Sequence, residues 1–210
     1  MEIQLNQIVP IPLKDMKLSD SEIWNQKFSF QSSNYYQIVA PSGTGKTTLL
    51  HILYGERKDF SGDISYRLKN DALSDLDLLR QSHISMVFQD LMLFEELTAL
   101  ENVLIKNQIL NYRSDEWIQQ AFDQLGILNK KNSLVGTMSR GERQRVAIIR
   151  ALCMPFQFLL LDEPFSHLDE LNEQKAAALI NDAVEELNAG IILVNVQPDN
   201  YFKYSHQLKL

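Results

Sequence analysis

The stretch that most constrains what this chain can fold into is Ala40-Pro41-Ser42-Gly43-Thr44-Gly45-Lys46-Thr47-Thr48. It follows an apolar run, Tyr36-Gln37-Ile38-Val39, and leads into Leu49-Leu50-His51-Ile52-Leu53-Tyr54, whose apolar residues have helical spacing. A glycine-rich turn between a strand and a helix points successive backbone N–H groups, and the positive end of the helix dipole, at one anion. The stretch therefore predicts a phosphate-binding loop in an α/β fold.

Each residue type in this loop has an expected role in binding a nucleotide. The backbone around the phosphates would be that of Pro41, Ser42, Gly43, Thr44 and Gly45. Lys46 would meet the β- and γ-phosphates, the Thr47 hydroxyl would ligate Mg²⁺, and Thr48 could bond the α-phosphate. The alternative, a polar loop that only caps a helix, leaves the order of strand, lysine and hydroxyl unexplained. The usual pattern begins with glycine where this chain has Ala40, which fits if its φ is negative and is strained if φ is positive.

Composition limits the classes of protein to consider. With 45% hydrophobic residues, 210 residues can bury a substantial core, as one domain or two closely packed lobes. The net charge of −7 and the pI near 5.1 argue against a general nucleic-acid binder. The single Cys153 excludes an intramolecular disulfide and is expected to be a buried apolar residue. No run of about 18 apolar residues and no signal-peptide layout occur, so we expect a cytosolic protein whose membrane association would come through a partner.

Predicted strands and helices alternate around the loop, as in an α/β fold. Antiparallel strands are expected between Met1 and Phe30, on either side of a polar turn at Lys14–Asp20. Further strands are expected at Phe60–Tyr66 after a turn, Ile84–Phe88, Phe158–Leu161 and Ile191–Val194. Helices are expected at Gly45–Tyr54, Ala72–Arg80, Thr98–Leu110, Ser114–Leu125, Gly141–Leu152 and Glu173–Leu187. Thr98 and Glu101 have the spacing of a capping box, and Ser114 and Ser139 are expected N-caps.

Two carboxylates, Asp162 and Glu163, directly follow the apolar run Phe158–Leu161. Open α/β sheets bind ligands at the carboxyl ends of their strands. Beside a phosphate loop, Asp162 is placed to hold Mg²⁺, and Glu163 to act as the base or to position the water for γ-phosphate hydrolysis. Without such a loop, an Asp-Glu pair in this place would indicate only a helix cap.

Two further segments could reach the phosphates. Gln89 follows a short strand and could contact both the metal and the attacking water, although a lone glutamine there would be an ordinary surface residue. Ser139 and Gly141 lie at the expected start of a helix in the segment Met138–Arg145, and charged residues follow them in the sequence. Such a helix start could contact a phosphate. A plain capped helix with a basic face explains that segment equally well.

Together these residues resemble the ATP-binding cassette (ABC) ATPases, and the resemblance covers nearly the whole chain. The motifs that carry it are the Walker A loop at Pro41–Thr48, the Q-loop at Gln89, the signature at Met138–Glu142, Walker B at Leu159–Glu163 with Pro164 after it, and the D-loop at Ser166–Asp169. The family implies a P-loop NTPase ABC fold in one domain, residues 1–210. Residues 1–89 and 151–210 would form a RecA-like core with an antiparallel β subdomain, and residues 90–150 an inserted α-helical subdomain.

The surroundings of the Q-loop look most like the cassettes of the lipoprotein-release, macrolide-export and FtsE cell-division group. The resemblance implies an ATP-binding and ATP-hydrolysing subunit of an ABC transporter or transporter-like complex that uses ATP and Mg²⁺. Its implied partners are an integral-membrane permease and a second cassette, either the same chain or a different one, with ATP between the two cassettes. The protein would then lie on the inner face of the cell membrane, held there by the permease.

The implied catalytic residues are Glu163, Gln89 and Lys46, and the implied metal ligands are Thr47, Asp162 and Gln89. The apolar segment Leu91-Met92-Leu93-Phe94 could receive a permease helix or pack in the core. A non-catalytic, nucleotide-gated subunit of a heterodimer is one alternative. A soluble ABC protein of translation or DNA repair is another, but such chains usually carry a second cassette or a long coiled-coil insertion.

Three positions depart from the family. Its switch histidine is replaced by Val196, which can neither donate a hydrogen bond to the γ-phosphate nor carry a proton. No aromatic ring lies in Ile11–Ser21, where the family stacks the adenine. Arg140 replaces the first signature glycine, which adds bulk but also a cation. Because the residues that would act directly on the phosphates are retained, we predict slow hydrolysis; loss of one transition-state donor lowers the rate by roughly 10²–10³.

Overall fold

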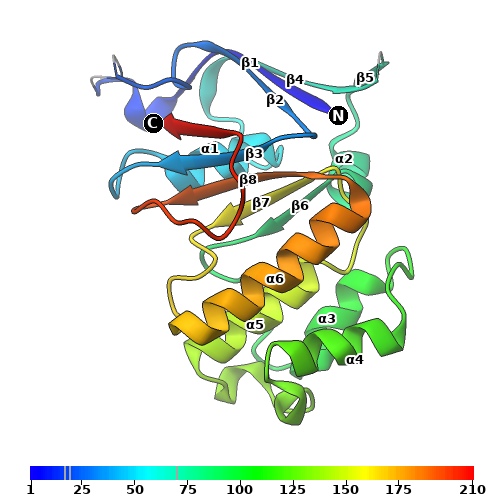
Figure 1. Cartoon of the computed structure of the whole chain (residues 1–210). Coiled ribbons are helices and arrows are strands. Elements are labelled where there is room, and N and C mark those ends of the chain that lie inside the picture. The colour runs from blue at the N-terminus through cyan, green and yellow to red at the C-terminus, as the bar shows by residue number, and fades with distance from the viewer. Residues whose placement is uncertain (17, 19, 70) are drawn as a thin grey trace. The chain divides into compact units, whose positions relative to one another are not determined.

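The computed structural model describes residues 1–16, 18, 20–69 and 71–210 (Figure 1). Two residues of the predicted polar turn, Lys17 and Ser19, lie outside this part of the chain. The described residues form two units. The first unit is Met1–Met86, Phe156–Glu163 and Asn188–Leu210, and the second unit is Val87–Pro155 and Pro164–Leu187.

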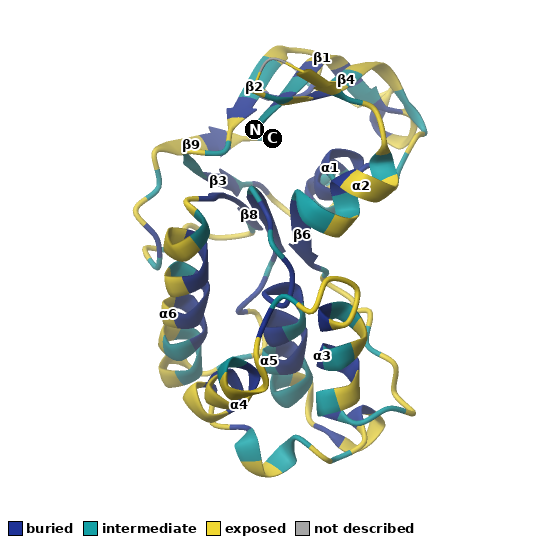
Figure 2. Ribbon diagram, turned by 90° about the vertical axis from the view of Figure 1, so that its right-hand side faces the viewer, coloured by how far each residue is buried: buried dark blue, intermediate teal, exposed yellow. Residues whose placement is uncertain are grey.

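A five-stranded sheet carries the phosphate loop. Its order among the described residues is β6 (Ile84–Val87), β7 (Phe158–Asp162), β8 (Gly190–Asn195), β3 (Tyr35–Val39) and β9 (His206–Lys209). The pairs β7–β8, β8–β3 and β3–β9 are parallel. Every residue of β7 is buried, as the apolar run predicts for a strand covered on both faces. The neighbouring strand β8 is buried along most of its length (dark blue in Figure 2). The carboxyl ends of β3, β7 and β8 therefore meet at one edge of the sheet.

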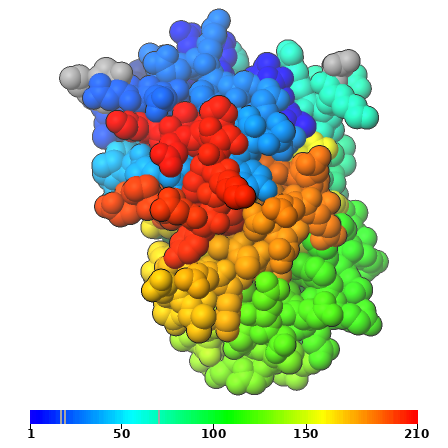
Figure 3. All heavy atoms as spheres, viewed as in Figure 1, coloured from blue at the N-terminus to red at the C-terminus, as the bar shows by residue number. Residues whose placement is uncertain are grey.

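A second, antiparallel sheet in the first unit contains four of the described strands. Its order is β2 (Lys27–Gln31), β1 (Glu2–Pro10), β4 (Phe60–Leu68) and β5 (Asp71–Leu73). Alternate residues of β1, including Ile3 and Leu5, are buried, and the residues between them face outward. The predicted strands near the N-terminus are thus present, except that Ile23 and Trp24 lie in a turn before β2. The C-terminal segment lies on the surface beside the N-terminal third of the chain (red and blue in Figure 3).

The helices of the first unit are α1 (Lys46–Leu53) and α2 (Leu76–Ser82), with a 3-10 turn η1 at Ile11–Leu13. The predicted helix at Ala72–Arg80 is wrong in its first half. Asp75 caps α2, because its side chain accepts hydrogen bonds from the backbone N–H groups of Asp77 and Leu78. The residues before the cap pair with β4 as β5.

The second unit is helical. Its helices are α3 (Ala99–Asn107), α4 (Asp115–Gln124), α5 (Arg140–Ala151) and α6 (Glu170–Leu187), with 3-10 turns η2 (Leu128–Lys130) and η3 (Val135–Thr137). The predicted caps are confirmed at Thr98, Ser114 and Ser139, and the first and last are complete capping boxes. Helix α3 ends three residues earlier than predicted, and α6 starts three residues earlier than predicted. None of the helices in the described part of the chain is long and apolar enough to cross a membrane.

Candidate functional site

The phosphate loop lies between the end of β3 at Val39 and the start of α1 at Lys46, as predicted. Gly43 and Gly45 adopt left-handed φ values of 82° and 97°, which glycine reaches at little cost. Gly45 is the N-cap of α1 and has no side chain, so it leaves the first N–H groups of the helix open to a ligand. Ala40 is buried and does not have a positive φ, so alanine fits there without strain.

Lys46 is buried at the mouth of this loop, with 6% of its side chain exposed. Its Nζ donates hydrogen bonds to the carbonyl oxygens of Ala40 and Pro41, each at 3.0 Å. The same nitrogen lies 3.5 Å from Oε1 of Glu163. The strand order explains this pairing, because β3 and β7 both flank β8 and run parallel to it. The structure thus brings together the loop lysine and the carboxylate that follows β7.

Asp162, the last residue of β7, is fully buried. By distance and angle, no donor among the residues that the structure describes makes a regular hydrogen bond to either carboxylate oxygen, although the Thr47 hydroxyl lies close enough to favour its charged form. Burial raises the pKa of Asp162 to about 6 and the charge of Glu163 adds to this, while the nearby Thr47 hydroxyl lowers it. A buried carboxylate without donors is destabilised unless a cation or a proton reaches it. Asp162 and Thr47 are hard oxygen ligands, so this donor set fits Mg²⁺.

Glu163 has a left-handed backbone conformation, with φ of 47°. A non-glycine residue in this region is strained by about 1 kcal/mol or more. The backbone N–H of Glu163 donates to the carbonyl of Val194 at 3.1 Å, which holds the bend against β8. Such local strain is typical of functional sites. Here it directs a partly exposed carboxylate at Lys46.

The end of β8 also lies beside the loop. The backbone N–H of Ala40 donates to the carbonyl of Asn195, the last residue of β8, at 3.1 Å. Val196, the first residue after the strand, is 37% exposed. Gln197 is exposed as well, and strand alternation no longer fixes where it points because the strand has ended.

Three predicted site residues belong to the second unit. Gln89 is exposed and lies two residues after β6. The Ser139 hydroxyl accepts a hydrogen bond from the N–H of Glu142 at 3.3 Å, as the N-cap of α5. Packing alone requires glycine at position 141, because a Cβ there would lie 2.7 Å from the carbonyl oxygen of His167. Arg140, between the serine and the glycine, is exposed.

Sequence reasoning missed two residues that contact the loop and its helix. The indole N–H of Trp24 donates to the carbonyl oxygen of Thr44 at 3.3 Å. Arg57 Nη1 donates to Oγ1 of Thr48 at 3.1 Å, so that hydroxyl already has a protein partner. No local pattern marks either contact, since both depend on how distant segments pack.

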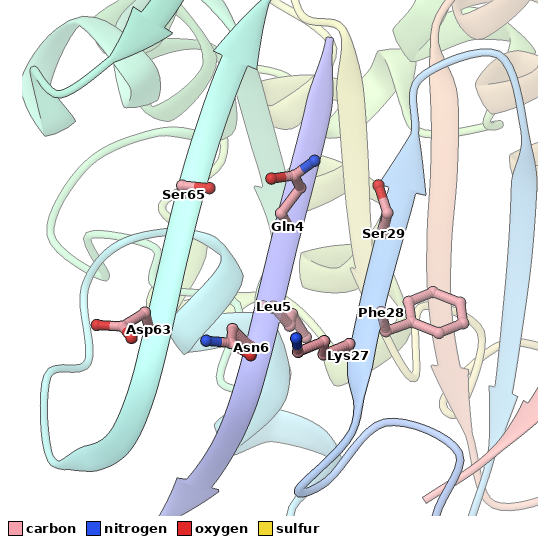
Figure 4. A pocket seen from close by; sticks show the side chains of 8 residues that line it. All are labelled: Gln4, Leu5, Asn6, Lys27, Phe28, Ser29, Asp63 and Ser65. Atoms are coloured by element: carbon pink, nitrogen blue, oxygen red, sulfur yellow. The ribbon is translucent and has the colours of Figure 1, made fainter.

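A separate hollow of about 530 Å³ lies on the outer face of the antiparallel sheet. Figure 4 shows polar side chains that project from β1, β2 and β4 around it. Its lining residues are Gln4, Leu5, Asn6, Lys27, Phe28, Ser29, Asp63 and Ser65. None of these belongs to the phosphate loop or to the two carboxylates, so the hollow is not part of the candidate nucleotide site.

Residues 23–166, well over half of the chain, match the family described as "ABC transporter". The chain belongs to the ABC transporter family. A lipoprotein-releasing system ATP-binding protein, LolD, from Hydrogenovibrio crunogenus is 34% identical over 205 residues, which cover 94% of this chain and 84% of the relative. The macrolide export ATP-binding/permease protein MacB from Rhodopirellula baltica is 34% identical over 202 residues, or 89% of this chain but only 28% of the longer relative.

Solved cassettes agree with this assignment of fold and family. A dimeric bacterial ABC transporter cassette matches with a TM-score of 0.79 and 27% identity, covering 99% of this chain and 94% of the solved one. A dimeric post-hydrolysis cassette bound to ADP and Pi matches with a TM-score of 0.75 and the same identity, covering 93% and 88%. The predicted P-loop ABC fold, and the resemblance to the LolD and MacB cassettes, are therefore confirmed for this ABC cassette.

Proposed function

We propose that this ABC cassette binds and slowly hydrolyses ATP, as one of two cassettes that drive a membrane permease. The observation that carries the proposal is the convergence of Lys46, Asp162 and Glu163 at the phosphate loop. Lys46 already lies among oxygen atoms there, and triphosphate oxygens would replace part of that set. The backbone of Pro41–Gly45 and the start of α1 would surround the phosphates.

Asp162 and Thr47, with Gln89 as a third ligand, would hold Mg²⁺, which supplies charge neutralisation on the phosphate oxygens when bound. Glu163 would accept the proton of the attacking water through its carboxylate, and Gln89 would orient that water. Lys46 would offer its ammonium to the β- and γ-phosphate oxygens. Ser139 and Gly141 would contact the γ-phosphate held by the second cassette, with Arg140 as an added cation. This division of roles uses side chains from the start of α1, the end of β7, the segment after β6 and the start of α5.

Slow turnover follows from Val196, which cannot donate a hydrogen bond at the position of the switch histidine. The rate of phosphate release should fall at least tenfold in Glu163→Gln, and rise roughly tenfold or more in Val196→His. Lys46→Ala serves as the control for loss of binding. If wild type and Glu163→Gln bind ATP but release phosphate equally slowly in the presence of the permease, hydrolysis is refuted. The same Val196 would then favour the second candidate, a non-catalytic, nucleotide-gated subunit.

The proposed permease contact is the segment after Gln89. Met92 and Phe94 are 49% and 54% exposed, whereas Leu91 is buried. Exposed apolar side chains grouped in one segment are typical of a docking surface. Through this contact the cassette would lie on the inner face of the membrane. Phe94→Asp should abolish co-purification with a polytopic membrane protein, whereas Leu171→Asp, at a leucine of α6 that is 62% exposed, should not. Equal retention of the membrane protein by both variants would refute the contact.

A further inference from the structure

We propose that Trp24 is a positioning residue of the phosphate loop, and that its indole N–H sets the direction of a loop N–H that binds phosphate. This inference rests on the proposed function, because it concerns the affinity of the same loop for ATP. It adds to that function a residue outside the loop, 20 positions earlier in the chain.

Trp24 contacts the phosphate loop directly. Trp24 is fully buried, and its Nε1 donates to the carbonyl oxygen of Thr44 at 3.3 Å. A Cβ placed on Gly45 would lie 3.2 Å from Cζ2 of Trp24 and 2.7 Å from Cδ1 of Leu13. Leu13 is 6% exposed. These two side chains therefore form an apolar floor directly under the last residues of the loop.

The Thr44 carbonyl that accepts from the indole is part of the peptide unit between Thr44 and Gly45. The carbonyl of Thr44 and the N–H of Gly45 belong to the same peptide bond. In a planar trans peptide the C=O and the N–H point in opposite directions. Because the indole draws the Thr44 carbonyl toward Trp24, the Gly45 N–H points away from the floor, toward the open side of the loop. That is the direction in which a phosphate-binding N–H has to point.

Trp24 is itself held in place by the turn in which it lies. Its backbone N–H donates to Oγ of Ser21 at 2.8 Å, and the N–H of Ile23 donates to the same oxygen at 3.2 Å. Ser21 and Ile23 are buried. The next residue, Asn25, has a left-handed φ of 57°, and its N–H donates to the carbonyl of Ile8 in β1 at 2.9 Å. The turn before β2 thus fixes the indole relative to the antiparallel sheet.

The other side of the loop is closed from within. Oγ1 of Thr44 donates to the carbonyl of Pro41 at 2.8 Å, and Nζ of Lys46 donates to that carbonyl at 3.0 Å. These bonds set the width of the loop, but neither of them orients the peptide between Thr44 and Gly45. That peptide is flanked by glycine, whose backbone is the least restricted of all residues. The indole supplies the restraint that glycine lacks.

The test compares two identical substitutions at the chain's two tryptophans, Trp24→Phe and Trp117→Phe. Phenylalanine keeps an aromatic ring but removes the N–H donor. Loss of one hydrogen bond should raise the Kd for Mg·ATP roughly 5- to 10-fold in Trp24→Phe, measured by calorimetry. Trp117 lies on α4 of the second unit, where its ring contacts Arg113, so Trp117→Phe should leave the Kd unchanged. Thermal unfolding of both variants reports any loss of packing separately.

A second variant separates the hydrogen bond from the packing. In the Trp117→Phe background, Trp24 is replaced by benzothienylalanine, in which sulfur takes the place of the indole N–H at nearly the same size. The Kd should rise as in Trp24→Phe while the unfolding temperature stays within a few degrees. An unchanged Kd in both Trp24 variants, with wild type binding ATP, overturns the inference alone. Failure of wild type to bind Mg·ATP overturns the proposed function and this inference together.

Discussion

Two left-handed bends in this chain are built in opposite ways. In the phosphate loop the positive φ values belong to Gly43 and Gly45. In the segment after Gln89 they belong to Leu91 and Met92, with φ values of 61° and 50°. Glycine reaches this region at little cost, whereas each side-chain-bearing residue is disfavoured there by roughly 1–2 kcal/mol. The positive φ values of the loop therefore carry no steric penalty, whereas those of the second bend have to be offset by contacts.

The contacts of the second bend come from helices of the same unit. Arg150, near the end of α5, donates from Nη2 to the carbonyl of Leu91 at 2.5 Å and from Nη1 to that of Met92. Asn102 of α3 is buried, accepts from the N–H of Phe94 at 2.8 Å and donates to its carbonyl at 2.9 Å. The polar groups of this bend are satisfied by the protein, whereas neither Asp162 oxygen at the phosphate loop accepts a regular hydrogen bond from the described residues. The chain itself completes the bend, whereas under the proposed function a ligand would complete the loop.

Gly45→Ala should have the largest effect, because it places a side chain where the loop requires glycine. The φ of 97° is strained for alanine, and the new Cβ would overlap Leu13 and crowd Trp24. Strain and overlap together should lower the free energy of unfolding of the nucleotide-free protein by about 4 kcal/mol, measured by chemical denaturation.

Gly43→Ala is the matched control. Its φ of 82° is equally strained for alanine, but a Cβ there meets no described atom within 4 Å. Only the backbone strain of alanine remains, so the free energy of unfolding should fall by about 1 kcal/mol. Equal losses in the two variants would mean that the floor under Gly45 contributes nothing.

Features of this molecule that depend on neighbouring residues could be predicted from the sequence. The strand–loop–helix order, the caps at Thr98, Ser114 and Ser139, and the buried strand β7 depend on residues a few positions apart, and the structure confirms them. Asp75 gives an equally local signal that interrupts the predicted helix at Ala72–Arg80. It was missed because the leucine spacing continues through it.

Features that depend on distant packing were not predictable. Nothing in the residues around Leu91 and Met92 indicates a left-handed bend, because Arg150 supplies the compensation from almost 60 positions away. The positive φ of Glu163 likewise depends on its bond to Val194 in the neighbouring strand. The approach of Lys46 to Glu163 requires the order β7–β8–β3, which one sequence does not specify. Local chemistry therefore located the candidate site, and tertiary contacts determine its geometry.

Arg150→Met should have the next largest effect. It keeps an apolar stem but removes two charge-assisted hydrogen bonds from the strained bend, which should lower the free energy of unfolding by about 3 kcal/mol. Saturating Mg·ATP should stabilise the variant and wild type by equal amounts, because the bend does not depend on the ligand. Arg143→Met is the control on the same helix: it loses an ion pair with the exposed Glu95 and one hydrogen bond to the Met138 carbonyl, so about 1–2 kcal/mol is expected. A smaller loss in Arg150→Met than in Arg143→Met would contradict the role given to Arg150.

Asp162→Asn should stabilise the protein when no metal or nucleotide is present. Since the pKa of Asp162 is about 6 in the folded protein and near 3.8 in the unfolded chain, the folded state holds the proton more tightly. The contribution of the protonated Asp162 to the free energy of unfolding is complete below pH 4, and it is lost as the pH rises through 6. Above that pH the charged carboxylate should cost roughly 2 to 3 kcal/mol, which asparagine removes.

The measurement is the difference in free energy of unfolding between Asp162→Asn and wild type in EDTA at pH 5 and pH 7.5. Taking a difference cancels the opposite contribution of His83, whose pKa burial lowers. The free energy of unfolding of the variant should increase relative to that of wild type as the pH rises. The variant should also lack the stabilisation that Mg·ATP gives to wild type. A difference that does not change with pH would show that the buried carboxylate has a partner in solution.

Met92→Gly and Met92→Ala should give the smallest effect and the most direct comparison of the two bends. Met92 is 49% exposed, so truncating its side chain removes little packing. Alanine keeps the strain of a φ near 50°, whereas glycine relieves it but adds freedom to the unfolded chain. The strain that glycine removes from the folded state is larger than the conformational entropy that it adds to the unfolded chain. The glycine variant should therefore be more stable than the alanine variant by about 0.5–1 kcal/mol. At Gly43 the same pair of residues should rank in the same order, because both positions are left-handed. If alanine is the more stable residue at position 92, the bend after Gln89 relaxes in solution and Arg150 does not hold it.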